Sequence, residues 1–249
     1  MSPTSSSEPD PSVSEPDPSA RRAELAANLT DVRERIDAAC AACGRAASGI
    51  TLIAVTKTWP AADVRLLSEL GVTDVGENRD QEAAPKAAAC ADLSLTWHFV
   101  GQLQTNKAHS VMRYADVVHS VDRPRLVSAL GRAARAAGRA VTCLVQVSFD
   151  NDPERAGVTP SELPALAAAI EAEQGLLLGG VMAVAPLGQD PAPAFAALRE
   201  CSDTVRRVRP TATIISAGMS GDLEHAIRAG ATHLRIGTAL LGARRPLVM

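Results

Sequence analysis

Aromatic residues and long apolar runs are both scarce in this chain of 249 residues. Phe, Trp and Tyr together make up 2% of it, too few for the stacking platforms on which proteins bind single-stranded nucleic acid. No run of about 18 apolar residues is present, so we expect no membrane span. The N-terminus also lacks the basic-then-apolar order of a signal peptide. Hydrophobic residues still make up 46%, enough for a sizeable core built from Ala, Val, Leu and Ile.

An excess of charge of one sign is missing as well. The chain has 25 Lys+Arg and 28 Asp+Glu, a formal net charge of −3. Residues 1–20 contain four acids and no base, so the remainder carries −3 + 4 = +1. No basic field therefore indicates DNA or RNA as a partner. We predict that residues 1–20, which are mostly Ser, Pro, Asp and Glu, form a disordered acidic tail, and that residues 21–249 form one domain.

The cysteines are too few and too scattered for a disulfide framework. Their number is odd, which indicates a reducing, cytoplasmic setting. Cys40 and Cys43 have a metal-like spacing but lack a second ligand pair, so a zinc site is not expected. The five positions are Cys40, Cys43, Cys90, Cys143 and Cys201.

Apolar strand-like runs alternate with Ala-, Leu-, Arg- and Glu-rich stretches along the chain. Several runs are apolar without alternation, as in parallel strands that are buried on both faces. Eight such strands with intervening helices predict a single (β/α)8 barrel. An open doubly wound sheet is the alternative, which the absence of a G-x-G-x-x-G fingerprint disfavours. The expected strands are 52–56, 72–75, 97–100, 117–121, 141–147, 177–184, 213–215 and 232–236, and the expected helices are 21–42, 61–70, 123–137, 161–172, 192–208 and 221–229.

In such a barrel, functional residues follow the ends of the strands. Lys57 follows the first strand and would face the barrel mouth, where a partly desolvated amine can attack an aldehyde to form a Schiff base. A solvated surface lysine is the alternative. Asn78 follows the second strand and suits a ligand hydroxyl, although spacing alone favours the more common use of Asn as a helix N-cap. His98, within an apolar run, is expected to be a hydrogen-bonded histidine of the core or of the barrel mouth.

Two loops of small residues follow the seventh and eighth strands. Residues 216–222 read Ser-Ala-Gly-Met-Ser-Gly-Asp, and residues 237–242 read Gly-Thr-Ala-Leu-Leu-Gly. Both precede helices, where free N–H groups favour an anion, and these loops are the usual phosphate site of the barrel fold. Arg235 stands two residues before Gly237 and would face a ligand ring or anion, or form a structural ion pair.

Taken together, these segments resemble the pyridoxal phosphate homeostasis proteins, the YggS/PROSC family. The resemblance spans residues 21–245. It departs from the family at Gln102, where Pro is common, and at residues 153–155. The segments that carry it are Leu52-Ile53-Ala54-Val55-Thr56-Lys57-Thr58, Gly76-Glu77-Asn78, residues 97–107 from Trp97 to Lys107, Gly180-Val181-Met182-Ala183, Ser216-Ala217-Gly218-Met219-Ser220-Gly221-Asp222 and Arg235-Ile236-Gly237-Thr238.

The resemblance implies a fold type III pyridoxal 5'-phosphate (PLP) protein, a single barrel similar to the N-terminal domain of alanine racemase. It implies that Lys57 holds PLP as a Schiff base, that Asn78 neighbours the pyridine ring, and that Arg235 faces the ring nitrogen. An arginine there disfavours a protonated ring nitrogen and weakens the cofactor as an electron sink. The implied phosphate cradle consists of Ser216, Gly218, Met219, Ser220, Gly237 and Thr238.

The function that follows is PLP homeostasis: the chain would hold PLP and buffer or deliver it without strong catalysis of its own. No catalytic residue and no metal ligand is expected. The expected partners are PLP itself and PLP-dependent apoenzymes, with no nucleic acid and no membrane, and the expected state is a cytoplasmic monomer. One alternative is a PLP-dependent amino-acid racemase-like enzyme, which needs a second acid/base group. The other is a barrel enzyme that acts on a phosphosugar through Lys57.

Overall fold

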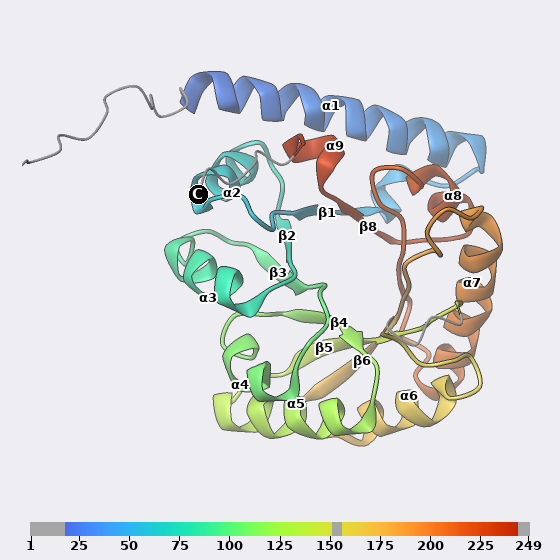
Figure 1. Ribbon diagram of the computed structural model, residues 1–249. Helices are drawn as coiled ribbons and strands as arrows, with labels where there is room; N and C mark the ends of the chain where they lie inside the picture. Colours follow the sequence, from blue (N-terminus) through green and yellow to red (C-terminus); the bar gives the residue numbers. More distant parts are fainter. Residues whose placement is uncertain (1–17, 151–155, 244–249) are drawn as a thin grey trace, which may run out of the picture.

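The computed structural model describes residues 18–150 and 156–243 and confirms the predicted barrel. Eight parallel strands close in chain order, with helices around them (Figure 1). Each expected strand is present, with its ends shifted by at most one or two residues. The strands are β1 (Thr51–Val55), β2 (Asp74–Glu77), β3 (Thr96–Phe99), β4 (Val117–Val121), β5 (Val141–Gln146), β6 (Leu176–Met182), β7 (Ile214–Ser216) and β8 (His233–Ile236).

The helices include three that the sequence patterns did not predict: α3, α4 and α9. An internal proline, Pro85, weakens the helical signal of α3, whereas α4 and α9 are single turns, too short to show a periodicity. The helices are α1 (Pro18–Ala42), α2 (Ala61–Glu69), α3 (Asp80–Ala89), α4 (Ala108–Val111), α5 (Pro124–Ala137), α6 (Leu163–Ala172), α7 (Pro191–Val208), α8 (Leu223–Arg228) and α9 (Thr238–Leu241), with 3-10 turns η1 (Ala47–Gly49) and η2 (Thr105–Lys107).

The first helix begins slightly before the expected domain boundary, since α1 includes residues 18–20 of the predicted tail. The rest of that tail, residues 1–17, lies outside the described residues, as do the departure at residues 153–155 and the last six residues of the chain. In the parts that the structure describes, no helix combines the length and the apolar character of a membrane span.

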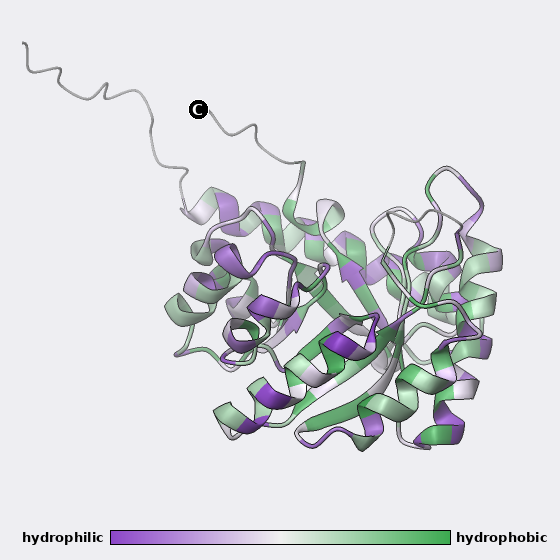
Figure 2. Cartoon of the chain, turned by 60° about the horizontal axis from the view of Figure 1, so that its bottom comes forward, coloured by the Kyte–Doolittle hydropathy of each residue, from purple (hydrophilic) through white to green (hydrophobic). Residues whose placement is uncertain are grey.

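The core has an outer layer and an inner layer. Most buried apolar side chains lie between the strands and the surrounding helices, whose outer surfaces carry the hydrophilic residues (Figure 2). Inside the barrel, one side is apolar and is formed by Val117, Leu144 and Met182, with Val184 and Ile214 packed against them. The other side of the interior is polar, which is unusual for a layer that branched apolar residues commonly fill.

Helix α1 precedes the barrel in the sequence and packs against the short helix α9, which follows β8. Leu25, Leu29 and Val32 are buried on one face of α1, at the spacing of an amphipathic helix. From the same face, the Arg21 guanidinium donates to the carbonyl of Leu241 at 3.0 Å, and the Asn28 amide donates to that of Leu240 at 3.0 Å. These contacts satisfy terminal carbonyls of α9 that have no partner within their own helix. Helix α1 therefore holds α9, whose first residues reach the candidate site, against the barrel.

We predict that Leu29→Ala lowers the free energy of unfolding by about 2–5 kcal/mol, because it leaves a buried cavity that the surrounding side chains fill only partly. Leu29 is 3% exposed. Urea unfolding followed by circular dichroism measures the change. Asp31→Ala, on the exposed face of the same helix, is the control and should stay within about 0.5 kcal/mol. Equal effects of the two variants would contradict the bracing role of α1.

Candidate functional site

A cavity of about 390 Å³ opens at the carboxyl ends of β1 and of its neighbours β2 and β8. This is the end at which barrel proteins place their functional residues. It contains Lys57, Asn78, Met219, Ser220, Arg235, Gly237 and Thr238, all predicted site residues, and also Val55, Thr58, Trp59, Val100, Gly101, Val184, Gly221 and Gly242. The structure thus brings together residues from six separate parts of the sequence.

Lys57 enters the cavity from a strained turn. It continues the inward alternation of Ile53 and Val55, whose side chains both lie against the inner face of Gly76. The next residue, Thr58, has a φ of 69°, a left-handed conformation that is a genuine outlier for a β-branched residue. Its N–H donates to a carboxylate oxygen of Glu82 at 3.0 Å, which helps to hold it there. Strain of this kind concentrates at functional sites, so the turn supports a functional role for Lys57 over a solvated surface lysine.

Behind this turn, α3 is anchored to β1 and β2 by a buried ion pair. The Lys86 ammonium contacts the Glu77 carboxylate and donates to the carbonyl of Thr56 at 2.8 Å. The Thr56 hydroxyl donates to the same Glu77 carboxylate at 2.6 Å. Burial raises the pKa of Glu77, against the opposing effect of Lys86. This network was not predicted from the sequence, although Glu77 lies within the Gly-Glu-Asn segment noted there. The network positions Thr56, the residue immediately before Lys57.

Arg235 is a buried cation on the cavity wall. It is 5% exposed, and it donates to the Ser216 hydroxyl at 2.6 Å and to the carbonyl of Ala183 at 2.8 Å. No carboxylate of residues 18–150 and 156–243 lies within ion-pair distance of it. Burial lowers its pKa to about 10, partly offset by the more distant charge of Asp222. Because a buried charge without a partner is costly, the cavity favours a ligand that accepts hydrogen bonds or carries negative charge at this point.

The two small-residue loops meet on one side of the cavity. The Ala239 N–H donates to the Ser220 hydroxyl at 3.1 Å, which ties the loop after β7 to the start of α9. Gly218 has a φ of 90°, and a side chain there would come within 2.6 Å of Ala226, so only glycine allows this turn. Ser216 and Gly218, two residues predicted for the phosphate cradle, lie behind the wall. The Ser216 side chain is fully buried and contacts His119 and Arg235 instead.

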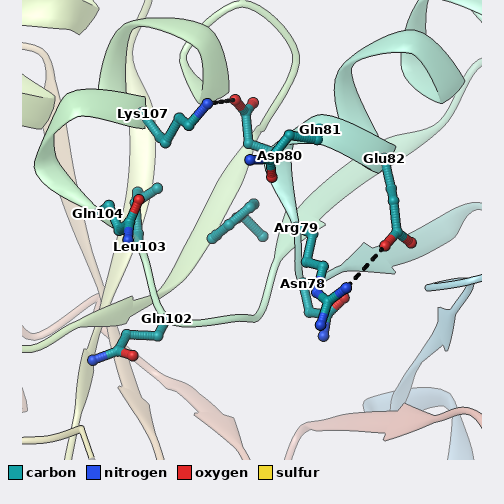
Figure 3. A pocket seen from close by; sticks show the side chains of 10 residues that line it. Asn78, Arg79, Asp80, Gln81, Glu82, Gln102, Leu103, Gln104 and Lys107 are labelled. Carbon is teal, nitrogen blue, oxygen red and sulfur yellow. Dashed lines mark ion pairs between the residues drawn. The ribbon is translucent and has the colours of Figure 1, made fainter.

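Asn78 lies between this cavity and a second one of about 440 Å³. A side chain on Gly101 would lie 2.2 Å from the Asn78 carbonyl oxygen, so the loop after β3 packs directly against the Asn78 backbone. In the second cavity, Lys107 faces Asp80 at 3.9 Å, and Arg79 faces Glu82 at 3.7 Å (Figure 3). Its charges are therefore already paired, unlike that of Arg235.

The polar side of the barrel interior contains histidines that the sequence analysis did not assign, together with His98. As expected, His98 is a hydrogen-bonded core residue: one ring nitrogen lies 3.0 Å from the Asp74 carboxylate and the other 2.9 Å from His119. Burial lowers the pKa of His119 well below its usual value, and burial also lowers the pKa of His233 to about 4.

These shifts predict an acid-labile fold. In the unfolded chain both histidines titrate near pH 6.5, so between about pH 4 and 6.5 the unfolded state binds protons that the folded state does not. The free energy of unfolding therefore falls as the pH drops through this window. For His233 alone the loss is about 3 kcal/mol, because burial lowers its pKa from about 6.5 to about 4. Urea midpoints measured from pH 7.5 downward, at roughly 0.5-unit steps, test this.

The matched variants are His233→Asn, which should flatten the pH dependence, and His109→Asn, which should not, because His109 is exposed. A slope that is the same in wild type and in His233→Asn would contradict the assignment.

Comparisons with known proteins show which family this chain belongs to. Residues 21–245 match the family described as "Alanine racemase, N-terminal domain". The "Pyridoxal phosphate homeostasis protein" of Mycobacterium tuberculosis is 44% identical over 244 residues, 90% of this chain and 95% of that protein. The protein of the same name from Escherichia coli is 36% identical over 227 residues, 89% of this chain and 97% of that protein.

Solved structures give the same picture. PipY of Synechococcus elongatus, determined with PLP bound, is 35% identical, with a TM-score of 0.77 over 88% of this chain and 100% of that one. The alanine racemase of Streptomyces coelicolor is 19% identical, with a TM-score of 0.70 over 90% of this chain and 59% of that chain. At that identity the likeness shows the fold alone.

Proposed function

Because the chain belongs to the pyridoxal phosphate homeostasis proteins of the alanine racemase N-terminal domain family, we propose that it binds PLP in the cavity of about 390 Å³ and buffers or delivers it. The observation that carries the proposal is the meeting of three features in that one cavity: the Lys57 amine, a buried guanidinium that has no carboxylate partner in the described part of the chain, and two loops of small residues. Each suits a different part of the same molecule.

The residues fit the cofactor at three points. PLP supplies an aldehyde, which forms a Schiff base with a lysine amine. Lys57 is the lysine that lines the cavity and would hold it. Arg235 would donate to the ring nitrogen, which answers its need for an acceptor. The backbone around Ser220 and Thr238 would bind the phosphate, because the first N–H groups of a helix have no intrahelical acceptor. Asn78 would contact the ring from the β2 side.

Ser216 and Gly218 contribute indirectly. Gly218 builds the turn that presents Met219 and Ser220, and Ser216 holds Arg235. The Met219 N–H already donates to the Asp222 carboxylate at 2.6 Å. We therefore assign the phosphate contacts to residues 220–221 and 237–238, and give Ser216, Gly218 and the Met219 backbone supporting roles.

A carrier role is favoured over a racemase-like enzyme by two features. An arginine that donates to the ring nitrogen keeps that nitrogen unprotonated, which weakens the stabilisation of carbanions. The single tyrosine of the chain, Tyr114, also does not line the cavity. It packs edge-on against Trp97, its hydroxyl lies 3.5 Å from Asp80, and burial raises its pKa. It is therefore badly placed to act as the second acid/base group that racemisation needs.

We further propose that the protein is a cytoplasmic monomer that passes PLP to apoenzymes. All five cysteines are free and four of them are buried, which suits a reducing compartment. Every side chain assigned to the cofactor comes from one chain, so the site needs no second copy.

We predict that the purified protein loaded with PLP shows a visible absorbance band that borohydride traps as a mass increase on the peptide containing Lys57. Lys57→Ala should lose both the band and the trapped mass, because it removes the amine. Lys107→Ala is the matched control: it removes a lysine from the neighbouring cavity and should leave both signals in place. A colourless wild-type protein that takes up no added PLP would instead support the phosphosugar alternative.

The carrier role predicts no amino-acid turnover. Exchange of the Cα hydrogen for deuterium, followed by NMR across a panel of amino acids, should be no faster with the loaded protein than with an equal concentration of free PLP. Exchange well above that background, and lost in Lys57→Ala, would establish the racemase-like alternative and overturn the carrier role.

A further inference from the structure

A continuous chain of hydrogen bonds crosses the polar side of the barrel interior and ends at Arg235. It begins at Asp74, at the start of β2, whose carboxylate lies 3.0 Å from His98 Nε2. His98 Nδ1 lies 2.9 Å from His119 Nε2, and His119 Nδ1 lies 2.9 Å from the Ser216 hydroxyl. That hydroxyl accepts from Arg235 at 2.6 Å. The chain thus joins residues from β2, β3, β4, β7 and β8. Its Asp74 end reaches solvent, with 20% of that side chain exposed, and its Arg235 end faces the cavity.

The two ends of the chain have fixed roles. The Arg235 guanidinium can only donate, so the Ser216 oxygen must accept from it. At the other end, burial raises the pKa of Asp74, but hydrogen bonds from His98 and Thr73 outweigh burial and keep that pKa below its usual value. Asp74 is therefore an ionised carboxylate at neutral pH and can only accept, so His98 Nε2 must carry a hydrogen.

The middle of the chain then has one arrangement that satisfies every group. Complete burial keeps His119 neutral, because its pKa lies well below the usual value. If His119 Nε2–H donates to His98 Nδ1, its own Nδ1 is free to accept from the Ser216 hydroxyl. The reverse arrangement would leave the buried Ser216 hydroxyl hydrogen without an acceptor, since that oxygen contacts only His119 and the donor Arg235, and this is costly. All donors therefore point the same way, from Arg235 toward Asp74.

We propose that His119 and Ser216 are positioning residues that hold Arg235 in one orientation on the wall of the cofactor cavity, in a hydrogen-bond chain whose direction Asp74 sets. This proposal rests on the proposed function for its effect on PLP. One terminal nitrogen of Arg235 is held by Ser216 and the other by the carbonyl of Ala183. The guanidinium plane is fixed by these two contacts, so its direction toward the ring nitrogen is set before the cofactor arrives, and binding requires no rearrangement.

The first test needs neither a variant nor the cofactor. Long-range 1H–15N correlation spectra of the cofactor-free wild-type protein at neutral pH distinguish the histidine tautomers. We expect His98 and His119 both to carry hydrogen on Nε2, with Nδ1 unprotonated. An Nδ1–H form of His119, or a cationic ring at either residue, would overturn the direction of the chain.

The second test reads the ring nitrogen itself. With 15N-labelled PLP bound, we expect an unprotonated pyridine nitrogen in the wild type. Ser216→Ala should weaken PLP binding by roughly tenfold or more, because it removes a charge-assisted hydrogen bond that holds Arg235, and should shift the pyridine 15N resonance. Ser120→Ala is the matched control: Ser120 is also buried in the barrel, on the strand that carries His119, and its hydroxyl has no partner among the described residues.

The possible outcomes are distinct. A merely structural role for Ser216 would lower stability while leaving the 15N resonance and PLP affinity as in Ser120→Ala, and that result would overturn the positioning role. A wild-type protein that binds no PLP would contradict the proposed function and remove the positioning role with it. The tautomers of His98 and His119 would then still decide the direction of the chain.

Discussion

The buried guanidinium of Arg235 is the constraint on which the rest of the site depends. A cation with 5% exposure and no carboxylate partner among the described residues is stable only where neutral acceptors surround it and a further acceptor can be supplied. The inner layer of this barrel is built accordingly. One side is packed with apolar residues, and the other gives its space to histidines, a serine and an aspartate that connect Arg235 to the far end of the barrel.

Close backbone packing shapes the cavity around that cation. Gly218 permits a left-handed turn beneath the loop after β7, and Gly101 lets the loop after β3 lie against the Asn78 backbone. Helix α1 binds the last carbonyls of α9, whose first residues line the cavity. A side chain at Gly218 would meet Ala226, and one at Gly101 would meet the Asn78 backbone, so close packing at these two glycines sets the positions of the cavity walls. This arrangement suits a site that holds a small rigid ligand in one orientation.

The same barrel occurs in an alanine racemase, and the proposed difference in function depends on individual residues. In the proposed function Lys57 is the attachment point for PLP, while the chain's one tyrosine is packed outside the barrel between Trp97 and Asp80. A shared fold therefore does not carry a shared reaction. Holding PLP in the proposed way requires a lysine, a cation that donates a hydrogen bond to the ring nitrogen, and a loop that binds the phosphate. Racemisation also requires a second group that transfers a proton.

The sequence by itself determined the barrel, because apolar runs and amphipathic stretches report local burial along the chain. It indicated Lys57, Asn78 and the two loops through their places after strands, and Arg235 through its place two residues before the second loop. The tertiary structure decided what the sequence could not. It placed Ser216 behind the cavity wall, paired Glu77 with Lys86, and joined Asp74, His98 and His119 in one chain. These contacts link residues far apart in the sequence, across a closed barrel. Their identity depends on strand register and side-chain direction, which no local pattern encodes.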